Sequence, residues 1–222
     1  MYTLITRDQW GAAPPNRQAP RLKRIDEIVI HHSVTDRAID IDDAKNITRA
    51  IQKDHLAREN PDGTLQFADI AYNYLIGPGC VLIGRGGTTQ GGATGNGWDG
   101  RTLSVCVIGD YEHQTVPLDV AATLKEFVDV ARAGQSTIPV VPHKAHYATE
   151  CCGKNLIAIL PTLEEPPMAG SSDYFTHPLT LQDGTPPQPY PTNVEGWYTF
   201  IHRELQLIRE SNQAILDELR RR

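Results

Sequence analysis

The chain has 222 residues, of which 40% are apolar and 22% are charged. This length can bury one core of ordinary domain size and leaves room for an appendage. A net charge of −6, without any Lys/Arg stripe that carries interleaved aromatics, argues against nucleic acid as a partner. The first residues lack the apolar core of a signal peptide, and no stretch approaches the roughly 20 apolar residues that span a bilayer. We therefore expect a soluble globular protein that uses no membrane and stays in the cytoplasm unless another device releases it.

The elements predicted in chain order describe an α/β protein with one central mixed sheet flanked by helices. Residues 7–15 are predicted to form an irregular arm, and 27–31 a first buried strand. An amphipathic helix follows over 42–58, because apolar positions recur there at helical spacing. Further strands are predicted over 70–76, 81–84, 104–108 and 138–141, with a hairpin at Gly77-Pro78-Gly79 and a second helix over 117–132.

The composition changes after Leu160. Half of the sixteen prolines lie between residues 161 and 191, which predicts a first domain over 1–160 and a Pro-rich linker or arm over 161–193. Over 194–222 apolar residues recur at alternating steps of three and four, with Asn212 at the one polar seam position. This pattern fits a coiled-coil seam that would make a homo-oligomer, and equally an amphipathic helix that docks back on the core.

The loop from 142 to 153 is the most informative stretch, because it brings imidazole and thiol groups close together. Its candidate metal ligands are His143, His146, Cys151 and Cys152. Two histidines and one cysteine give zinc three protein ligands and leave a fourth position for water or substrate, which is the arrangement of a catalytic site.

The additional histidine is best supplied by the pair His31-His32, which ends the first predicted strand. Adjacent strand residues point to opposite faces, so only one of the two can reach the metal, and alternation alone does not choose between them. Cys80 and Cys106 lie in strand-like apolar runs and are predicted to fill the core. The neighbouring Cys151 and Cys152 are poorly placed for a disulfide, so we expect one ligand and one bystander.

Four segments carry a further pattern, namely Thr6–Ala12, Ile28–Ser33, Asp69–Ile76 and His143–Gly153. In this order they resemble the type 2 N-acetylmuramoyl-L-alanine amidases, a family that includes peptidoglycan recognition proteins and small amidase lysozymes of bacteriophages. The resemblance covers about residues 3 to 160. Its most specific element is the spacing of seven residues between His143 and Cys151.

The resemblance implies a zinc hydrolase that cleaves the amide bond between N-acetylmuramic acid and the L-alanine of the stem peptide. It implies His31, His143 and Cys151 as ligands of Zn²⁺, and Tyr72 as the residue that steers water or stabilises the oxyanion. Thr149 stands where some phage enzymes carry Lys, and it can donate one hydrogen bond to the oxyanion. Bacterial peptidoglycan is the implied partner, and a phage endolysin that waits in the cytoplasm is the favoured role.

Other residues receive a structural interpretation first. His32 and His146 are expected to be packed or hydrogen-bonded, and a helix-face histidine such as His55 is more often structural than substrate-lining. Glu150 is either a proton shuttle or, more simply, a solvated carboxylate.

Two departures from the family pattern bear on the site. The usual Cys-Pro-Gly is Cys151-Cys152-Gly153 here, which places a second thiol where it could compete for zinc. The Gly-rich segment 91–100 replaces a Gly-Ala-His-Ala turn. It could form a groove floor in which Trp98 stacks on a sugar, or a mobile surface loop.

Three classes of function stay open from the sequence. The first is an active amidase of the endolysin type. The second is a peptidoglycan-binding module without activity, and the third is a virion-associated structural protein that carries an amidase unit.

Overall fold

A computed structural model describes residues 2–132 and 138–164 of the chain. Its centre is one six-stranded sheet in the order β1-β4-β3-β5-β2-β6. The strands are β1 (Thr3–Ile5), β2 (Glu27–His32), β3 (Tyr74–Gly77), β4 (Cys80–Ile83), β5 (Thr102–Val107) and β6 (Val140–Pro142). Only the hairpin pair β3–β4 is antiparallel; the other four pairs are parallel. The predicted mixed sheet is therefore confirmed.

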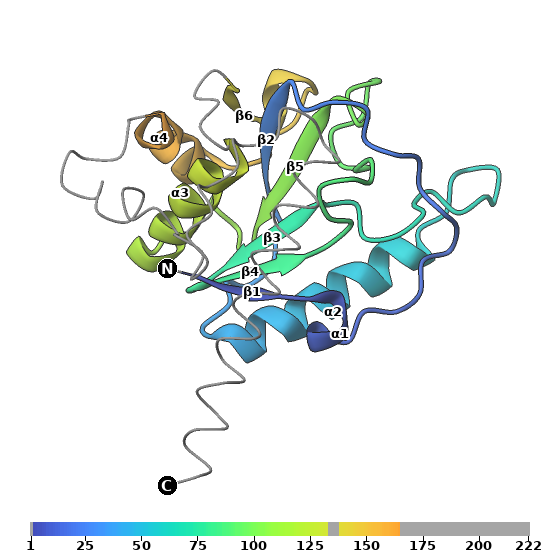
Figure 1. Cartoon of the computed structure of the whole chain (residues 1–222), viewed down its shortest axis with the longest axis horizontal. Helices are drawn as coiled ribbons and strands as arrows, with labels where there is room; N and C mark the ends of the chain where they lie inside the picture. The colour runs from blue at the N-terminus through green and yellow to red at the C-terminus, as the bar shows by residue number, and fades with distance from the viewer. Residues whose placement is uncertain (1, 133–137, 165–222) are drawn as a thin grey trace, which may run out of the picture. The chain divides into compact units, whose positions relative to one another are not determined.

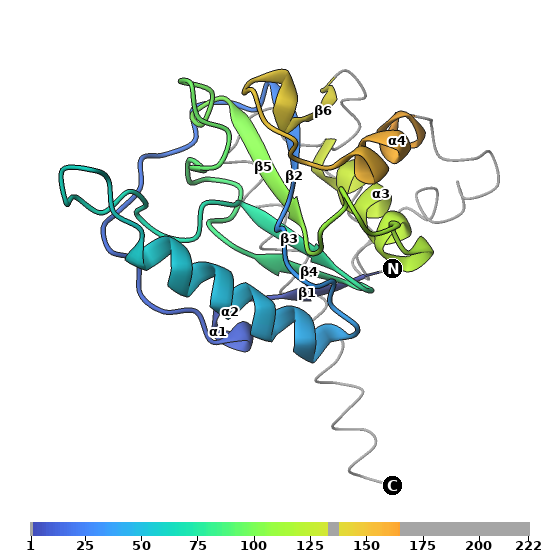
Figure 2. The same cartoon turned by 180° about the vertical axis from the view of Figure 1, so that it is seen from behind.

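Helices cover both faces of this sheet. They are α1 (Arg7–Trp10), α2 (Ile41–Ala57), α3 (Leu118–Arg132) and α4 (Lys154–Leu163), with a 3₁₀ turn, η1 (His143–Ala145), after β6. Figures 1 and 2 show α3 and α4 together on one side of the sheet and α2 on the other. Since α2 packs on β3 and β4, the same face of β5 and β2 is left for loops to cover.

Alternation along β2 and β5 decides which side chains meet those loops. Ile28 and Ile30 point into the core beneath α3 and α4. His31 points the other way and lies in register with Cys106 of β5. The polar residues Thr102 and Ser104 of β5 are fully buried on that second face. One face of this strand pair is thus a hydrophobic core, and the other carries polar groups and a histidine.

Helix α1 lies where the sequence prediction had an irregular arm. Thr6 caps α1, since its hydroxyl accepts the Gln9 N–H, and the Gln9 side chain bonds back to the Thr6 N–H. This capping box was readable in the sequence. Gly11 then ends the helix in the left-handed conformation, and Trp10 is fully buried.

The strand predicted over 70–76 begins only at Tyr74, so that prediction was wrong for residues 70–73. Residues 70–73 do not continue the strand ladder, and side-chain hydrogen bonds connect this segment to the loop after β4. The Arg85 guanidinium donates to the carbonyls of Asp69 and Ile70, and the Asn73 amide donates to those of Gly86 and Thr89. Together with main-chain bonds such as that from the Arg85 N–H to the Tyr72 carbonyl, these side-chain bonds hold the segment against the loop that follows β4.

The C-terminal predictions lie mostly outside the described residues. The boundary predicted at residue 160 falls within α4, which continues through Pro161 to Leu163. Buried Arg132 holds this end of α4, donating to the Leu163 carbonyl and to Glu164. The Pro-rich arm over 161–193 beyond that point, and the helix over 194–222 with its proposed oligomer seam, remain predictions.

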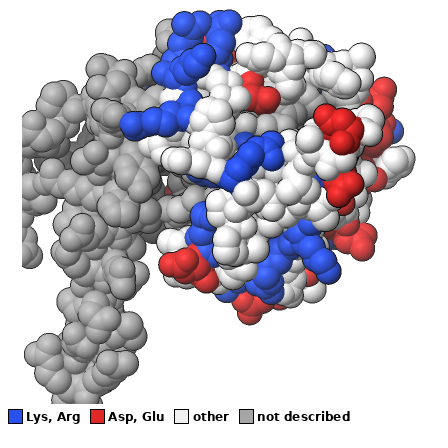
Figure 3. Space-filling model, turned by 90° about the vertical axis from the view of Figure 1, so that its right-hand side faces the viewer, with Lys and Arg blue, Asp and Glu red and all other residues white. Residues whose placement is uncertain are grey.

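Charge is distributed in small groups on the face of the molecule shown in Figure 3. There, Lys and Arg side chains form several separate groups, with Asp and Glu beside them. This face offers no continuous basic stripe for a phosphate backbone. Within the part of the chain that the structure describes, no helix is long and apolar enough to cross a membrane.

Candidate metal centre

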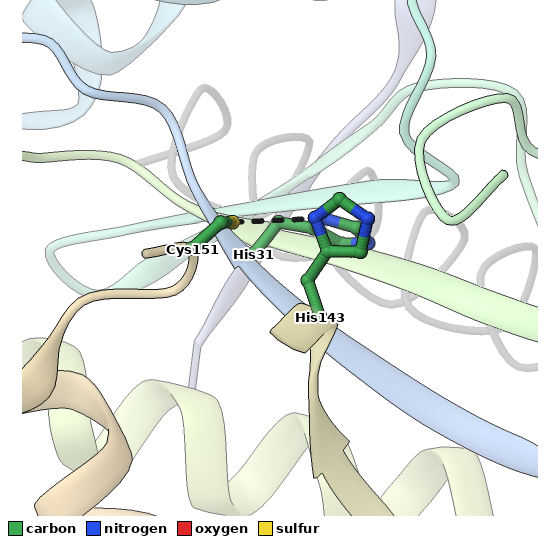
Figure 4. Close-up of side chains that lie close together, drawn as sticks. All are labelled: His31, His143 and Cys151. Atoms are coloured by element: carbon green, nitrogen blue, oxygen red, sulfur yellow. Dashed lines mark hydrogen bonds between the residues drawn. The ribbon is translucent and has the colours of Figure 1, made fainter. Parts of the chain in front are cut away.

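The structure brings together the three side chains that the resemblance implies as ligands. His31, His143 and Cys151 each offer one ligand atom, and these atoms lie within 4.8 Å of one another. Figure 4 shows both imidazoles and the thiol pointing toward a common point. Among residues 2–132 and 138–164 this is the one group of three or more His, Cys, Asp or Glu with such a geometry.

The topology explains why residues 31 and 143 meet. β2 and β6 are parallel neighbours, with Ile30 in register with Pro142. The next residue after each of these is a histidine, so both imidazoles leave the carboxyl ends of adjacent strands. The centroids of the two rings are 4.4 Å apart. The loop after η1 then returns Cys151 to the same point, where its Sγ lies 3.8 Å from His31 Nδ1.

This donor set fits zinc. Bonds of about 2.3 Å to sulfur and about 2.0 Å to nitrogen at a tetrahedral angle place the two ligand atoms about 3.5 Å apart, close to the observed separation. Burial lowers the pKa of both His31 and His143, so the imidazoles are neutral, as metal ligation requires. The buried Nε2 of His31, the ring nitrogen that does not face Cys151, has no hydrogen-bond partner among the described residues.

Main-chain bonds hold the cysteine in place. The His32 N–H donates to Cys151 Sγ at 3.4 Å, and the Cys151 carbonyl accepts from the Lys144 N–H. The adjoining Gly153 has φ +88°, and a Cβ there would lie 2.3 Å from the Tyr111 backbone. Only glycine fits this position, which explains why glycine follows the cysteine pair.

Tyr72 lies beside the three ligands. Its ring centroid is 5.5 Å from that of His31 and 5.6 Å from that of His55. Burial, followed by the neighbouring thiols of Cys106 and Cys151, raises the pKa of the phenol well above its ordinary value. The hydroxyl therefore keeps its proton at neutral pH and can donate a hydrogen bond.

Thr149 is tied to the ligand loop. Its hydroxyl accepts the Cys151 N–H at 3.2 Å and retains its own proton for donation. The neighbouring Glu150 is exposed, in agreement with a solvated carboxylate. Thr149 thus stabilises the turn that carries Cys151, and its role at the oxyanion stays a prediction.

The other candidate ligands point away from the site. The His32 ring faces the opposite side of β2, and its Nδ1 accepts the Tyr111 N–H. His146 pairs through Nε2 with Glu27 at 2.6 Å. Cys152 is fully buried in the core beneath α3 and α4. These placements agree with the structural interpretation of both histidines and leave Cys152 outside the ligand group.

His55 lies on the α2 side of Tyr72. Its Nδ1 accepts the Ala71 N–H at 3.0 Å, and its ring packs on Phe67. Phe67 also lines a polar cavity of about 300 Å³, together with Arg17, Arg85 and part of the Gly-rich segment, among others. An open hollow beside Phe67 is thus available to a ligand with polar groups, although none of the three candidate metal ligands lines it.

The Gly-rich segment packs on the ligand loop. Its Trp98 ring packs at a tilt of 39° against the His146 ring, with the ring centroids 4.2 Å apart, and the Arg101 guanidinium lies 4.7 Å from the indole centroid. The exposed aromatic beside the candidate ligand His143 is instead Tyr147, whose ring lies nearly parallel to that of His143 at 6.0 Å and which is 53% exposed. Sequence reasoning missed Tyr147, although it stands only four residues after the predicted ligand.

Sequence comparison finds peptidoglycan-recognition proteins among the relatives of this chain, while no family model matches it. Peptidoglycan-recognition protein 2 of Holotrichia diomphalia is 28% identical over 110 residues, which span 50% of this chain and 56% of that protein. Peptidoglycan-recognition protein SC2 of Drosophila simulans is 28% identical over 162 residues, which span 69% of this chain and 82% of the relative.

Structure comparison gives the same answer for the fold. The crystal structure of Drosophila peptidoglycan recognition protein SD matches with a TM-score of 0.62 and 22% identity, over 75% of this chain and 96% of that one. Peptidoglycan recognition protein LE, in complex with tracheal cytotoxin, matches with a TM-score of 0.62 and 25% identity, over 72% and 92% of the two chains. The homologues of this chain are therefore peptidoglycan-recognition proteins, at modest identity, and it has their amidase-like fold.

Proposed function

We propose that this protein is a zinc-dependent amidase that cleaves the bond between N-acetylmuramic acid and the L-alanine of the peptidoglycan stem peptide. The observation that supports it most is the convergence of His31, His143 and Cys151 beside Tyr72. A domain that only binds peptidoglycan has no need of three converging metal ligands with a protonated phenol next to them.

Five residues would have distinct roles in this reaction. His31 and His143, as neutral imidazoles, and Cys151, as a thiolate, would hold the ion. Zinc, when bound, supplies a Lewis acid that activates water and polarises the scissile carbonyl. Tyr72 would donate a hydrogen bond to the oxygen on which negative charge develops, and Thr149 would add a second donor from the loop that carries Cys151. Since Thr149 carries no charge, its contribution should be the smaller of the two.

The proposed substrate is supported by the structural neighbours and by the polar cavity that Phe67 lines. One structural neighbour is described as a complex with tracheal cytotoxin, a monomeric diaminopimelic acid-type peptidoglycan. In this chain the polar cavity next to Phe67 would receive the stem peptide, and exposed Tyr147 would contact the glycan. The endolysin role, with the protein held in the cytoplasm until release, belongs to the same proposal and has its support in the sequence alone.

The second candidate is peptidoglycan binding without cleavage, which the names of the homologues favour. Digestion of purified peptidoglycan, followed by mass analysis of the fragments, separates the two. An amidase releases stem peptides with free L-alanine amino termini and leaves the glycan chains intact. Retention on the polymer with no released peptide, in protein that contains zinc, would instead support a binding module.

A further inference from the structure

A loop from the middle of the chain contacts one of the proposed zinc ligands. The Thr94 carbonyl oxygen lies 3.2 Å from His143 Nε2. A carbonyl can only accept, so this contact requires the hydrogen of the neutral imidazole to be on Nε2. The lone pair is then on Nδ1, the other ring nitrogen, which is free to face His31 and Cys151.

Thr94 itself is held from three directions. Its side chain is fully buried, and its hydroxyl lies 3.2 Å from that of Thr102 and 3.0 Å from that of Ser104. The Asp99 carboxylate accepts the N–H groups of Thr94 and Gly95 at 3.0 and 3.1 Å. Thr102 and Ser104 belong to β5, so the carbonyl is fixed relative to the sheet that carries His31.

The same loop reaches the metal loop at a second point. The Asn96 side chain donates to the His146 carbonyl at 2.8 Å, and the Trp98 ring packs at a tilt against that of His146. His146 is also paired with Glu27 of β2. The two loops are therefore joined on both sides of η1, which begins at His143.

We propose that the segment Thr94–Asp99, which we term the clamp loop, is an outer-sphere support that fixes the tautomer and orientation of His143 for zinc. This inference rests on the proposed zinc site and adds Thr94 and Asp99 as positioning residues. Partners of this kind fix the ring of a ligating histidine, and their loss costs about 10- to 100-fold in metal affinity. Asp99 acts at a distance, because it holds the peptide unit that presents the carbonyl.

The test uses the full chain and compares Asp99→Ala with Asp99→Asn. The asparagine oxygen can still accept both N–H groups, whereas alanine cannot. A matched control is Asp62→Ala, because Asp62 similarly accepts the N–H and hydroxyl of Thr64 in a separate surface loop. The zinc dissociation constant is measured by competition with a chromophoric chelator. Nitrogen NMR of the imidazoles in metal-free protein reports the His143 tautomer.

We expect Asp99→Ala to bind zinc about tenfold more weakly and to lose the single Nε2–H tautomer of His143. Asp99→Asn and Asp62→Ala should match the wild type in both measurements. If Asp99→Ala fails to fold, Thr94→Val removes the buried hydroxyl at constant shape and should weaken zinc binding, with Thr94→Ser restoring it.

Unchanged zinc affinity and an unchanged His143 tautomer in folded Asp99→Ala or Thr94→Val would overturn the proposal that the clamp loop positions His143. A wild-type chain that binds no zinc would overturn the proposed function instead, and the tautomer in metal-free protein would still decide whether Thr94 orients His143.

Discussion

Burial of His55 makes the stability of the fold depend on pH. This side chain is 7% exposed, and burial lowers its pKa from an ordinary value of 6.5 to about 4. Protonation would also put a hydrogen on Nδ1, where the Ala71 N–H now donates. The folded protein therefore binds a proton at His55 less readily than the unfolded chain does.

Because the folded pKa is depressed, the unfolded state binds more protons below about pH 6.5, and stability is lost as the pH falls toward 4. A shift of about 2.5 units corresponds to about 3 kcal/mol in total, of which about 2 kcal/mol is lost between pH 7 and pH 5. His55→Asn should remove this contribution while its amide oxygen accepts the Ala71 N–H.

The assay is urea unfolding at pH 7 and pH 5, followed by tryptophan fluorescence, with chelator present so that metal binding does not contribute. Between pH 7 and pH 5, the free energy of unfolding should fall by about 2 kcal/mol more in the wild type than in His55→Asn. His113→Asn is the control for the removal of an exposed histidine, since the His113 side chain is 76% exposed. An equal fall in the free energy of unfolding of His55→Asn and the wild type would show that His55 does not cause the pH dependence.

Three further predictions concern the site itself. Tyr72→Phe should keep one zinc per chain and lose about 100- to 1,000-fold in kcat, and an unchanged rate would make the tyrosine a core residue only. Tyr147→Ala should raise the half-saturating peptidoglycan concentration about 3- to 10-fold with kcat retained, whereas Tyr147→Phe should not; equal behaviour of the two variants would exclude stacking on the glycan. Cys152→Ala should retain full zinc while lowering the free energy of unfolding by about 1–2 kcal/mol, and loss of zinc would show that this thiol is a ligand.

Much of the fold could be predicted because its elements carry strong local patterns. Helix α2 has apolar residues at helical spacing, and it was predicted within one residue at each end. The segment before β3 could not be predicted in the same way. Its β-branched and aromatic residues read as a strand, but the bonds from Arg85 come from 15 residues away and override that pattern.

At the site, the residue types and their spacing identified the ligand candidates, but geometry was needed to separate neighbours. His31 and His32 differ only in the face of β2 that they occupy, and alternation did not say which face was which. The support from Thr94 acts through a main-chain carbonyl. Because every residue has such a carbonyl, the residue type at position 94 could not reveal it. Tyr147 was overlooked because exposure beside a ligand becomes visible only once the loop is folded.

The most direct test of the account is zinc K-edge X-ray absorption on the purified full chain. The proposed zinc centre should show one sulfur at about 2.3 Å together with nitrogen and oxygen ligands at about 2.0 Å. Cys151→Ser should lose the sulfur, and Cys152→Ala should keep it. A zinc environment without sulfur, or one whose sulfur persists in Cys151→Ser, would contradict the proposed centre.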